Sequence, residues 1–221
     1  KVDFSRLEIL VLDEADRMLD MGFIDAVKEI AEATPKSRQT LLFSATLEGQ
    51  VLKVANQLLK KPESIALAAS NRRHKSIQQH MHHADSKAHK QKLLEHHLES
   101  GQLFKSLVFT ATKRGAEQVA KVLRGKNLKS AALHGDMSQN KRRQTVENLR
   151  KGRIDTLVAT DVAARGLDIK DISHVINYDL PTVAEDYIHR IGRTGRASAT
   201  GCAISLVGPA DWKKLSQIEK L

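Results

Sequence analysis

Short apolar runs alternate with amphipathic stretches along most of this sequence, and this alternation limits the chain to few folds. Several runs, such as 106–109 and 156–159, are almost entirely apolar, which is typical of parallel strands covered on both faces. Alternation of strands and helices predicts an α/β fold with a parallel sheet and right-handed crossovers. We predict strands at 8–12, 40–44, 64–67, 77–81, 106–109, 130–133, 156–159, 174–177 and 203–207. We predict helices at 24–33, 51–60, 86–99, 115–123, 139–149, 183–190 and 210–221.

A boundary near 68–75 separates two parts of the chain, because the polar, charged segment at 70–75 has the composition of a linker. The part that follows it, 72–221, holds six of the predicted strands, which is enough for a complete domain. The part that precedes it, 1–68, holds only three, and a parallel sheet of three strands has little core. We therefore predict one complete domain at 72–221 and an incomplete one at 1–68.

Basic residues outnumber acidic ones, and the excess lies entirely in the second part. The 221 residues include 36 Lys and Arg against 26 Asp and Glu, a net charge of +10. Residues 1–66 hold 9 basic and 11 acidic side chains, whereas residues 67–221 hold 27 and 15 and carry a net +12. This charge predicts a polyanionic partner such as nucleic acid, although a soluble basic surface has the same composition. Aromatic residues make up only 4%, so the backbone of a nucleic acid is favoured over its bases as the point of contact.

Composition excludes several other classes of protein. No apolar stretch approaches the roughly 18 residues of a membrane span, so we expect no membrane contact. Cys202 is the only cysteine, which excludes an intrachain disulfide and fits a reducing, cytoplasmic compartment. Seven of the ten histidines lie between 74 and 97, but no cysteine or acidic residue completes a ligand set. We predict a solvated surface there, not a metal site. We expect Trp212 to be a packing residue of the last helix, the alternative being a platform on which a base stacks.

Four segments place polar and charged side chains where predicted strands end. Residues 13–16 read Asp-Glu-Ala-Asp; in nucleotide hydrolases an aspartate at this position holds Mg²⁺ and the next acid directs the attacking water. An acidic helix cap would give the same pattern, and Ser-Ala-Thr at 44–46 by itself also suggests a cap. Residues 159–168 place a hydroxyl, a carboxylate, a guanidinium and a glycine in one loop. Residues 189–196 read His-Arg-Ile-Gly-Arg-Thr-Gly-Arg, which is typical of a loop that presents guanidinium groups to phosphate.

These four segments have the order and approximate spacing found in DEAD-box RNA helicases, and the sequence resembles that family over essentially its whole length. Segments 18–23, 109–115 and 193–201 are most similar to the bacterial RhlE-like subgroup, and 40–49 is similar to the SrmB-like one. The resemblance implies two RecA-like domains that bind ATP and RNA across their cleft. Residues 1–68 would be the C-terminal part of the first, ATP-binding domain, and residues 72–221 would be the second, the helicase C-terminal domain.

The resemblance also implies roles for individual residues. For ATP hydrolysis, Asp13 would hold Mg²⁺ through water, Glu14 would activate the attacking water, Asp168 would contact the ribose, and Arg193 and Arg196 would reach the γ-phosphate. For coupling, His189 would link motifs across the cleft, and Asp16, Ser44 and Thr46 would connect hydrolysis to strand separation. RNA contacts without sequence preference would come from Thr112, Gly135, Gln139, Arg142, Thr160 and Asp161.

One departure from the family pattern is large. The family's glycine-rich loop, which ends in Gly-Lys-Ser/Thr and cradles the phosphates, has no counterpart in these residues. The first glycine, Gly22, follows the acidic segment, and the only Gly-Lys pair, at Gly125, is followed by Asn127. We therefore interpret the sequence as a helicase fragment that lacks the Walker A half of its first domain and does not hydrolyse ATP alone. The alternatives are a non-catalytic module that binds the RNA backbone and a superfamily 2 DNA helicase.

Overall fold

The chain divides into two compact units, Lys1–Ala68 and Ala69–Leu221. The structure, a computed structural model, describes residues 2–66, 76–99, 105–165, 167, 169, 171–195 and 200–221. The predicted linker at 70–75 lies outside the described residues. Each unit is described below by itself.

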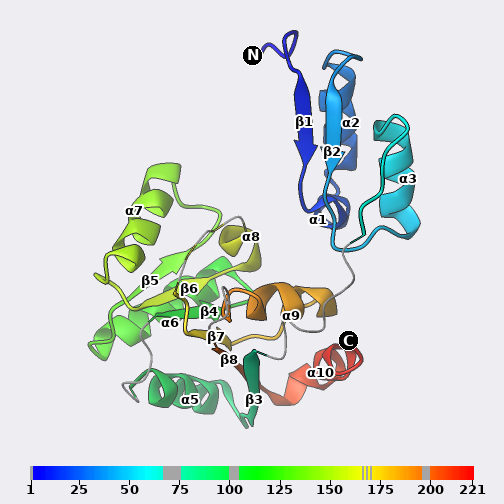
Figure 1. Cartoon of the computed structure of the whole chain (residues 1–221). Coiled ribbons are helices and arrows are strands. Elements are labelled where there is room, and N and C mark those ends of the chain that lie inside the picture. The colour runs from blue at the N-terminus through cyan, green and yellow to red at the C-terminus, as the bar shows by residue number, and fades with distance from the viewer. Residues whose placement is uncertain are drawn as a thin grey trace. The chain divides into compact units, whose positions relative to one another are not determined.

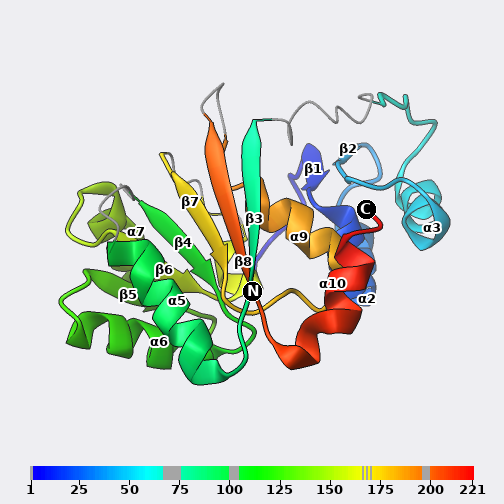
Figure 2. The same cartoon turned by 90° about the horizontal axis from the view of Figure 1, so that it is seen from below.

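The second unit is built on a sheet of six parallel strands (Figure 2). They are β3 (Ile77–His83), β4 (Ser106–Phe109), β5 (Ser130–Leu133), β6 (Thr156–Ala159), β7 (His174–Asn177) and β8 (Gly201–Val207). Their order across the sheet is β3-β8-β7-β4-β6-β5. The predicted α/β fold with a parallel sheet is confirmed, and β4 to β7 have the predicted bounds.

Helices cover both faces of this sheet (Figure 1). They are α5 (Lys87–Glu99), α6 (Lys113–Gly125), α7 (Gln139–Arg150), α8 (Asp161–Ala164), α9 (Ala184–Ile191), the 3₁₀ turn η1 (Pro209–Asp211) and α10 (Trp212–Ile218). Helices α5 and α6 bury apolar side chains such as Leu94 and Leu123 against one face, together with Val108 of β4. Leu149 of α7 and Ala163 of α8 pack with Phe109 against the other face. Because side chains alternate along a strand, neighbouring residues of β4 serve the two different cores.

The first unit has a two-stranded parallel sheet of β1 (Ile9–Leu12) and β2 (Gln39–Leu42). Its helices are α1 (Ala15–Asp20), α2 (Ile24–Glu32) and α3 (Gly49–Leu58). Ile9 and Val11 of β1 are exposed, as are Leu41 of β2 and Phe43 just after it. Val11 is paired with Leu41 in register, so these side chains leave one face of the small sheet bare.

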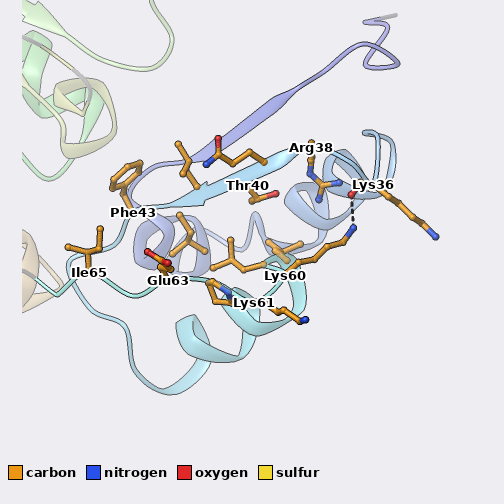
Figure 3. A pocket seen from close by; sticks show the side chains of 14 residues that line it. Lys36, Arg38, Thr40, Phe43, Lys60, Lys61, Glu63 and Ile65 are labelled. Atoms are coloured by element: carbon orange, nitrogen blue, oxygen red, sulfur yellow. Dashed lines mark hydrogen bonds between the residues drawn. The ribbon is translucent and has the colours of Figure 1, made fainter.

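The strand predicted at 64–67 is wrong for the residues that the structure describes, because 64–66 have no regular structure. Figure 3 shows a hollow beside this stretch, lined by residues of β2, by Phe43, by residues 58–63 and by Ile65, among others. A strand needs a hydrogen-bonded neighbour, and among the described residues no strand pairs with residues 64–66.

Two further differences concern the helices and Trp212. Short helices α1 and α8 were not predicted, since six and four residues are too few to show a helical period. Trp212, expected to be a packing residue of the last helix, is 58% exposed at the start of α10. No helix in the described part of the chain is long and apolar enough to cross a membrane.

We expect the two units to differ in stability. Amide hydrogens of β4, β6 and β7 lie inside a sheet covered on both faces and should exchange slowly, whereas those of β1 and β2 should exchange faster because one face of their sheet is bare. Hydrogen exchange followed by mass spectrometry on the 221-residue chain measures this difference. Equal protection of the two sheets in a monomeric sample would contradict it.

Candidate functional site

The acidic segment forms a tight turn between β1 and α1. Glu14 has a φ of 54°, in the left-handed region that non-glycine residues rarely adopt, and its backbone N–H donates to Oδ1 of Asp13 at 2.9 Å. The next N–H, of Ala15, donates to the carbonyl of Phe43 at 3.0 Å. Backbone strain of this kind costs about 1–3 kcal/mol and is concentrated at functional turns. The turn leaves the Asp13 carboxylate exposed at the carboxyl end of β1.

Asp16 connects this turn to the Ser-Ala-Thr segment that follows β2. Its Oδ2 accepts a hydrogen bond from the backbone N–H of Ala45 at 3.2 Å. Within that segment, the Ser44 hydroxyl donates to the carbonyl of Thr46 at 2.6 Å. The three residues predicted to couple hydrolysis to strand separation therefore lie together, joined by hydrogen bonds that a change in either loop would disturb.

The residues predicted to contact RNA gather at the carboxyl edge of the six-stranded sheet. Thr112 follows β4, Gly135 follows β5 and Thr160 follows β6, and these three strands are neighbours in the order β4-β6-β5. Thr112 also caps α6 by accepting the Gly115 N–H at 3.0 Å, and Ser138 caps α7 in the same way. The amino ends of two long helices thus reach an edge where exposed Gly135 and Gln139 leave the backbone accessible.

Arg142 lies one turn into α7 and is half-buried. Its Nη2 donates to the carbonyl of Ala163 in α8 at 3.4 Å, a long bond that holds the side chain across two helices. The guanidinium keeps further donors for a phosphate at this edge.

Arg190 is the most buried charge of the site, with 2% of its surface exposed. Its Nε and Nη2 donate to the two carboxylate oxygens of Asp161 at 2.6 and 2.8 Å. Nη1 donates to the side chain of Asn177 at 3.0 Å and to the carbonyl of Asp179 at 2.7 Å, and the guanidinium lies 4.8 Å from the ring centre of Phe109. The guanidinium therefore ties α9 to the ends of β4, β6 and β7.

Sequence reasoning missed this role of Arg190 and gave Asp161 to RNA. In the structure both carboxylate oxygens of Asp161 accept hydrogen bonds from Arg190, and the contact of Asp161 with RNA stays a prediction. Arg190 was within the segment at 189–196, but its partner lies 29 residues away and no local pattern links the two. The one available signal was an aspartate in the 159–168 loop and several arginines in the 189–196 segment.

His189 and Arg193 come from α9 and the turn that follows it. They line a shallow recess of the second unit together with Asp161, Arg165 and Asp186. Nη1 of Arg193 donates to the carbonyl of Leu167 at 3.4 Å, and Arg165 pairs with Asp186 at 3.5 Å. The recess is therefore rich in guanidinium groups, which suits a phosphate. Asp168 and Arg196, predicted to bind the nucleotide, lie outside the described residues.

The histidines gather on a different surface, between α5 and β3. The ring centres of His82 and His97 are 4.8 Å apart. Burial and the nearby His82 and His96 lower the pKa of His97 below its ordinary value. Among the described residues no group of three or more His, Cys, Asp or Glu side chains is placed to hold a metal ion.

Comparison with known proteins agrees with this geometry. Residues 1–54 match the family described as DEAD/DEAH box helicase, and residues 89–198 match the Helicase conserved C-terminal domain. The ATP-dependent RNA helicase SrmB of Haemophilus influenzae is 45% identical over 219 residues, which cover 99% of this chain and 50% of that protein. The chain belongs to the DEAD-box RNA helicase family. The relatives are named as ATP-dependent RNA helicases, and helicases of this family use ATP and a divalent metal ion.

Solved structures of the family are also similar. Saccharomyces cerevisiae Dbp5 bound to RNA and ADP BeF3 matches with a TM-score of 0.86 and 34% identity over 98% of this chain and 57% of that one. Escherichia coli SrmB bound to the regulator RraA matches with a TM-score of 0.63 and 42% identity, over 65% of this chain and 85% of that one. The chain spans about half the length of the curated relatives it matches.

The Asp161–Arg190 pair gives a test of this site. Replacing Asp161 with Ala leaves a buried guanidinium without its carboxylate, so we expect the free energy of unfolding of the second unit to fall by about 3 kcal/mol. Urea denaturation followed by circular dichroism measures the change. As a control, Asp136→Ala removes an aspartate from an exposed pair with Lys113 and should change stability little. Equal effects of the two variants would show that the buried pair is not a structural requirement.

Proposed function

We propose that this chain is the portion of an ATP-dependent RNA helicase that couples ATP hydrolysis to RNA binding and local unwinding of duplexes. The proposal is carried by one observation: charged or polar loops follow strand ends in both units. In the first unit Asp16 is bonded to the Ser-Ala-Thr segment, and in the second the three loops predicted to contact RNA follow neighbouring strands. The similarity to Dbp5 bound to RNA and ADP BeF3 supports it. The single cysteine is consistent with a cytoplasmic protein.

For the nucleotide, the proposal gives each unit its own part. Asp13, exposed at the end of β1, suits Mg²⁺ held through water, because this ion keeps most of its water and takes one or two carboxylates. The ion would neutralise charge on the phosphates of ATP. Glu14, fixed beside Asp13 by the strained turn, would orient and deprotonate the attacking water. In the second unit, Arg193 and Arg196 would stabilise charge on the γ-phosphate, Asp168 would contact the ribose, and His189 would transmit nucleotide binding to the other motifs.

For RNA, the proposal relies on contacts to the backbone. Thr112, Gly135, Gln139 and Thr160 offer hydroxyl, amide and backbone N–H donors at one edge, and Arg142 adds a guanidinium. Asp161 would act indirectly, by fixing the loop after β6 through Arg190. Such contacts position an RNA strand without reading its base sequence. A module that only binds the RNA backbone remains the second candidate for these 221 residues taken alone, since they contain no glycine-rich loop ending in Gly-Lys-Ser/Thr.

We expect the 221-residue chain to show no RNA-stimulated ATP hydrolysis. Positioning of the γ-phosphate supplies most of the catalysis in this reaction, and these residues contain no glycine-rich loop to position it. Phosphate release measured with RNA, with DNA and without nucleic acid gives the answer. Turnover that RNA stimulates and that Glu14→Gln abolishes would refute this expectation, and equal stimulation by DNA would favour a DNA helicase.

We expect the chain to bind single-stranded RNA weakly, with little sequence preference and with a strong dependence on salt. The net charge of +12 on residues 67–221 supplies the attraction, and each neutralised phosphate should add about 0.7 to the salt slope. Arg142→Ala should weaken binding to all sequences equally, because its assigned partner is a phosphate. Fluorescence anisotropy at several salt concentrations measures both affinity and slope.

Arg193→Ala is the matched control for this measurement, since it removes the same charge from the loop assigned to ATP. It should change RNA binding much less than Arg142→Ala. If Arg193→Ala weakened binding more, the division between an RNA face and a nucleotide face would be wrong.

A further inference from the structure

Trp212 is the one tryptophan of the chain and opens the last helix, α10, with 58% of its surface exposed. The apolar stripe of α10 runs through Trp212, Leu215 and Ile218 at intervals of three residues, and Leu215 is buried. Leu215 and Ile218 pack with Leu180 and Val207, so they already anchor the helix. Trp212 continues the same stripe beyond the edge of the core, where packing does not account for it.

The indole ring does not lie alone on the surface. It stacks on the ring of His83, the last residue of β3, with ring centres 5.1 Å apart and planes 26° from parallel. Met81, two residues earlier and on the same side of β3, is also exposed. We call this surface, formed by Met81, His83 and Trp212, the aromatic ledge.

The backbone that carries Trp212 is held firmly. Oδ2 of Asp211 accepts the Gly208 N–H at 2.9 Å and pairs with Nζ of Lys90 at 3.2 Å. Burial opposes the charged form of Asp211, but the Gly208 N–H and Lys90 outweigh it and lower the pKa of this carboxyl. These contacts fix η1 and the first turn of α10, and the stack on His83 holds the ring itself, so a ligand stacking on it would have little side-chain freedom to freeze.

The ledge lies on the same edge of the sheet as the residues assigned to RNA. All six strands are parallel, His83 is the last residue at the carboxyl end of β3, and Trp212 lies five residues after the carboxyl end of β8. Thr112, after β4, is three strands away from β3 in the order β3-β8-β7-β4, a distance of about 15 Å along the edge. Exposed Lys213 adjoins the ledge, which suits an anionic backbone.

We propose that the aromatic ledge is a stacking platform for a base of single-stranded RNA, at the far end of the edge that holds the RNA backbone. This inference rests on the proposed RNA binding and extends it by a second kind of contact. An exposed indole, stacked from behind by an imidazole, presents one flat face, and every base has a face that can stack on it. The platform would therefore add affinity without adding sequence preference.

Because Trp212 is the only tryptophan, its fluorescence reports on the ledge directly. Titrating the 221-residue chain with short oligouridylate should quench the emission, since a stacked base quenches indole. Heparin and an abasic ribose-phosphate oligomer of equal length carry negative charge without bases and should leave the emission nearly unchanged. Fluorescence anisotropy of a labelled oligouridylate measures binding independently of the tryptophan.

Substitutions at Trp212 show whether an effect on RNA binding comes from the loss of stacking or from a change in folding. Trp212→Ala should weaken RNA binding about tenfold, whereas Trp212→Phe, which keeps an aromatic face, should lose much less. Val122→Ala, which trims an exposed apolar residue on α6, is the matched control and should bind as the unchanged chain does. Equal melting temperatures of the three variants would show that the effect is on binding.

Several outcomes would overturn the proposal. The anisotropy measurement could show binding while the tryptophan emission is not quenched and Trp212→Ala has no effect. That result would refute the ledge as a stacking platform and would leave the proposed RNA binding in place. Absence of any binding would overturn both. Equal quenching by heparin would show that the emission responds to negative charge and not to a stacked base, which would refute the platform. If the emission changed with protein concentration in the absence of RNA, the ledge would be a contact between copies of the chain and not a platform for a base.

Discussion

The guanidinium of Arg190 is the constraint on which the loops of the second unit depend. A charge with 2% exposure is stable only when every donor finds a partner, and here the partners come from the ends of β6 and β7 and from the loop beyond β7. The aromatic ring of Phe109, at the end of β4, closes the remaining side. One side chain thus sets the positions of three strand ends, and the same strand ends begin the segments assigned to RNA and to the nucleotide. A ligand that shifts the loop after β6 must disturb Arg190, and through it α9, which carries His189.

The first unit uses a weaker version of the same arrangement. A carboxylate, Asp16, bonds to a backbone N–H of the neighbouring loop, and Ala15 bonds to the carbonyl of Phe43. These bonds hold the left-handed conformation of Glu14, which the sequence alone would disfavour. The strain is tolerated because the bonds on either side restrain the turn, even though the sheet that carries it has one bare face.

Much of this architecture could be predicted from the sequence, for reasons that particular elements make clear. Strands β4 and β6 are covered on both faces, so their sequences are almost continuously apolar and their bounds were predicted correctly. The stretch at 64–66 has a similar composition, but composition cannot tell whether a neighbouring strand is present. The four charged segments were recognised because their residues are close in sequence. The Asp161–Arg190 pair and the stack of Trp212 on His83 were missed because each joins residues far apart in the chain, where only the fold decides proximity.

The position of Trp212 also bears on the low aromatic content of the chain. The aromatic content of 4% argues against a surface that reads bases through several stacked rings, but it allows a single ring at the end of an edge that binds the backbone. Backbone contacts and stacking on one ring share a physical property: neither depends on which base is present. A protein that must act on many sequences can gain affinity from both without losing generality. The charge asymmetry fits this view, since residues 1–66 are slightly acidic and the net positive charge lies in the part that carries both the edge assigned to RNA and the ledge. Electrostatic attraction weakens as salt rises, whereas stacking depends on it much less. The ledge would therefore matter most at higher ionic strength, where the basic edge alone holds RNA least well.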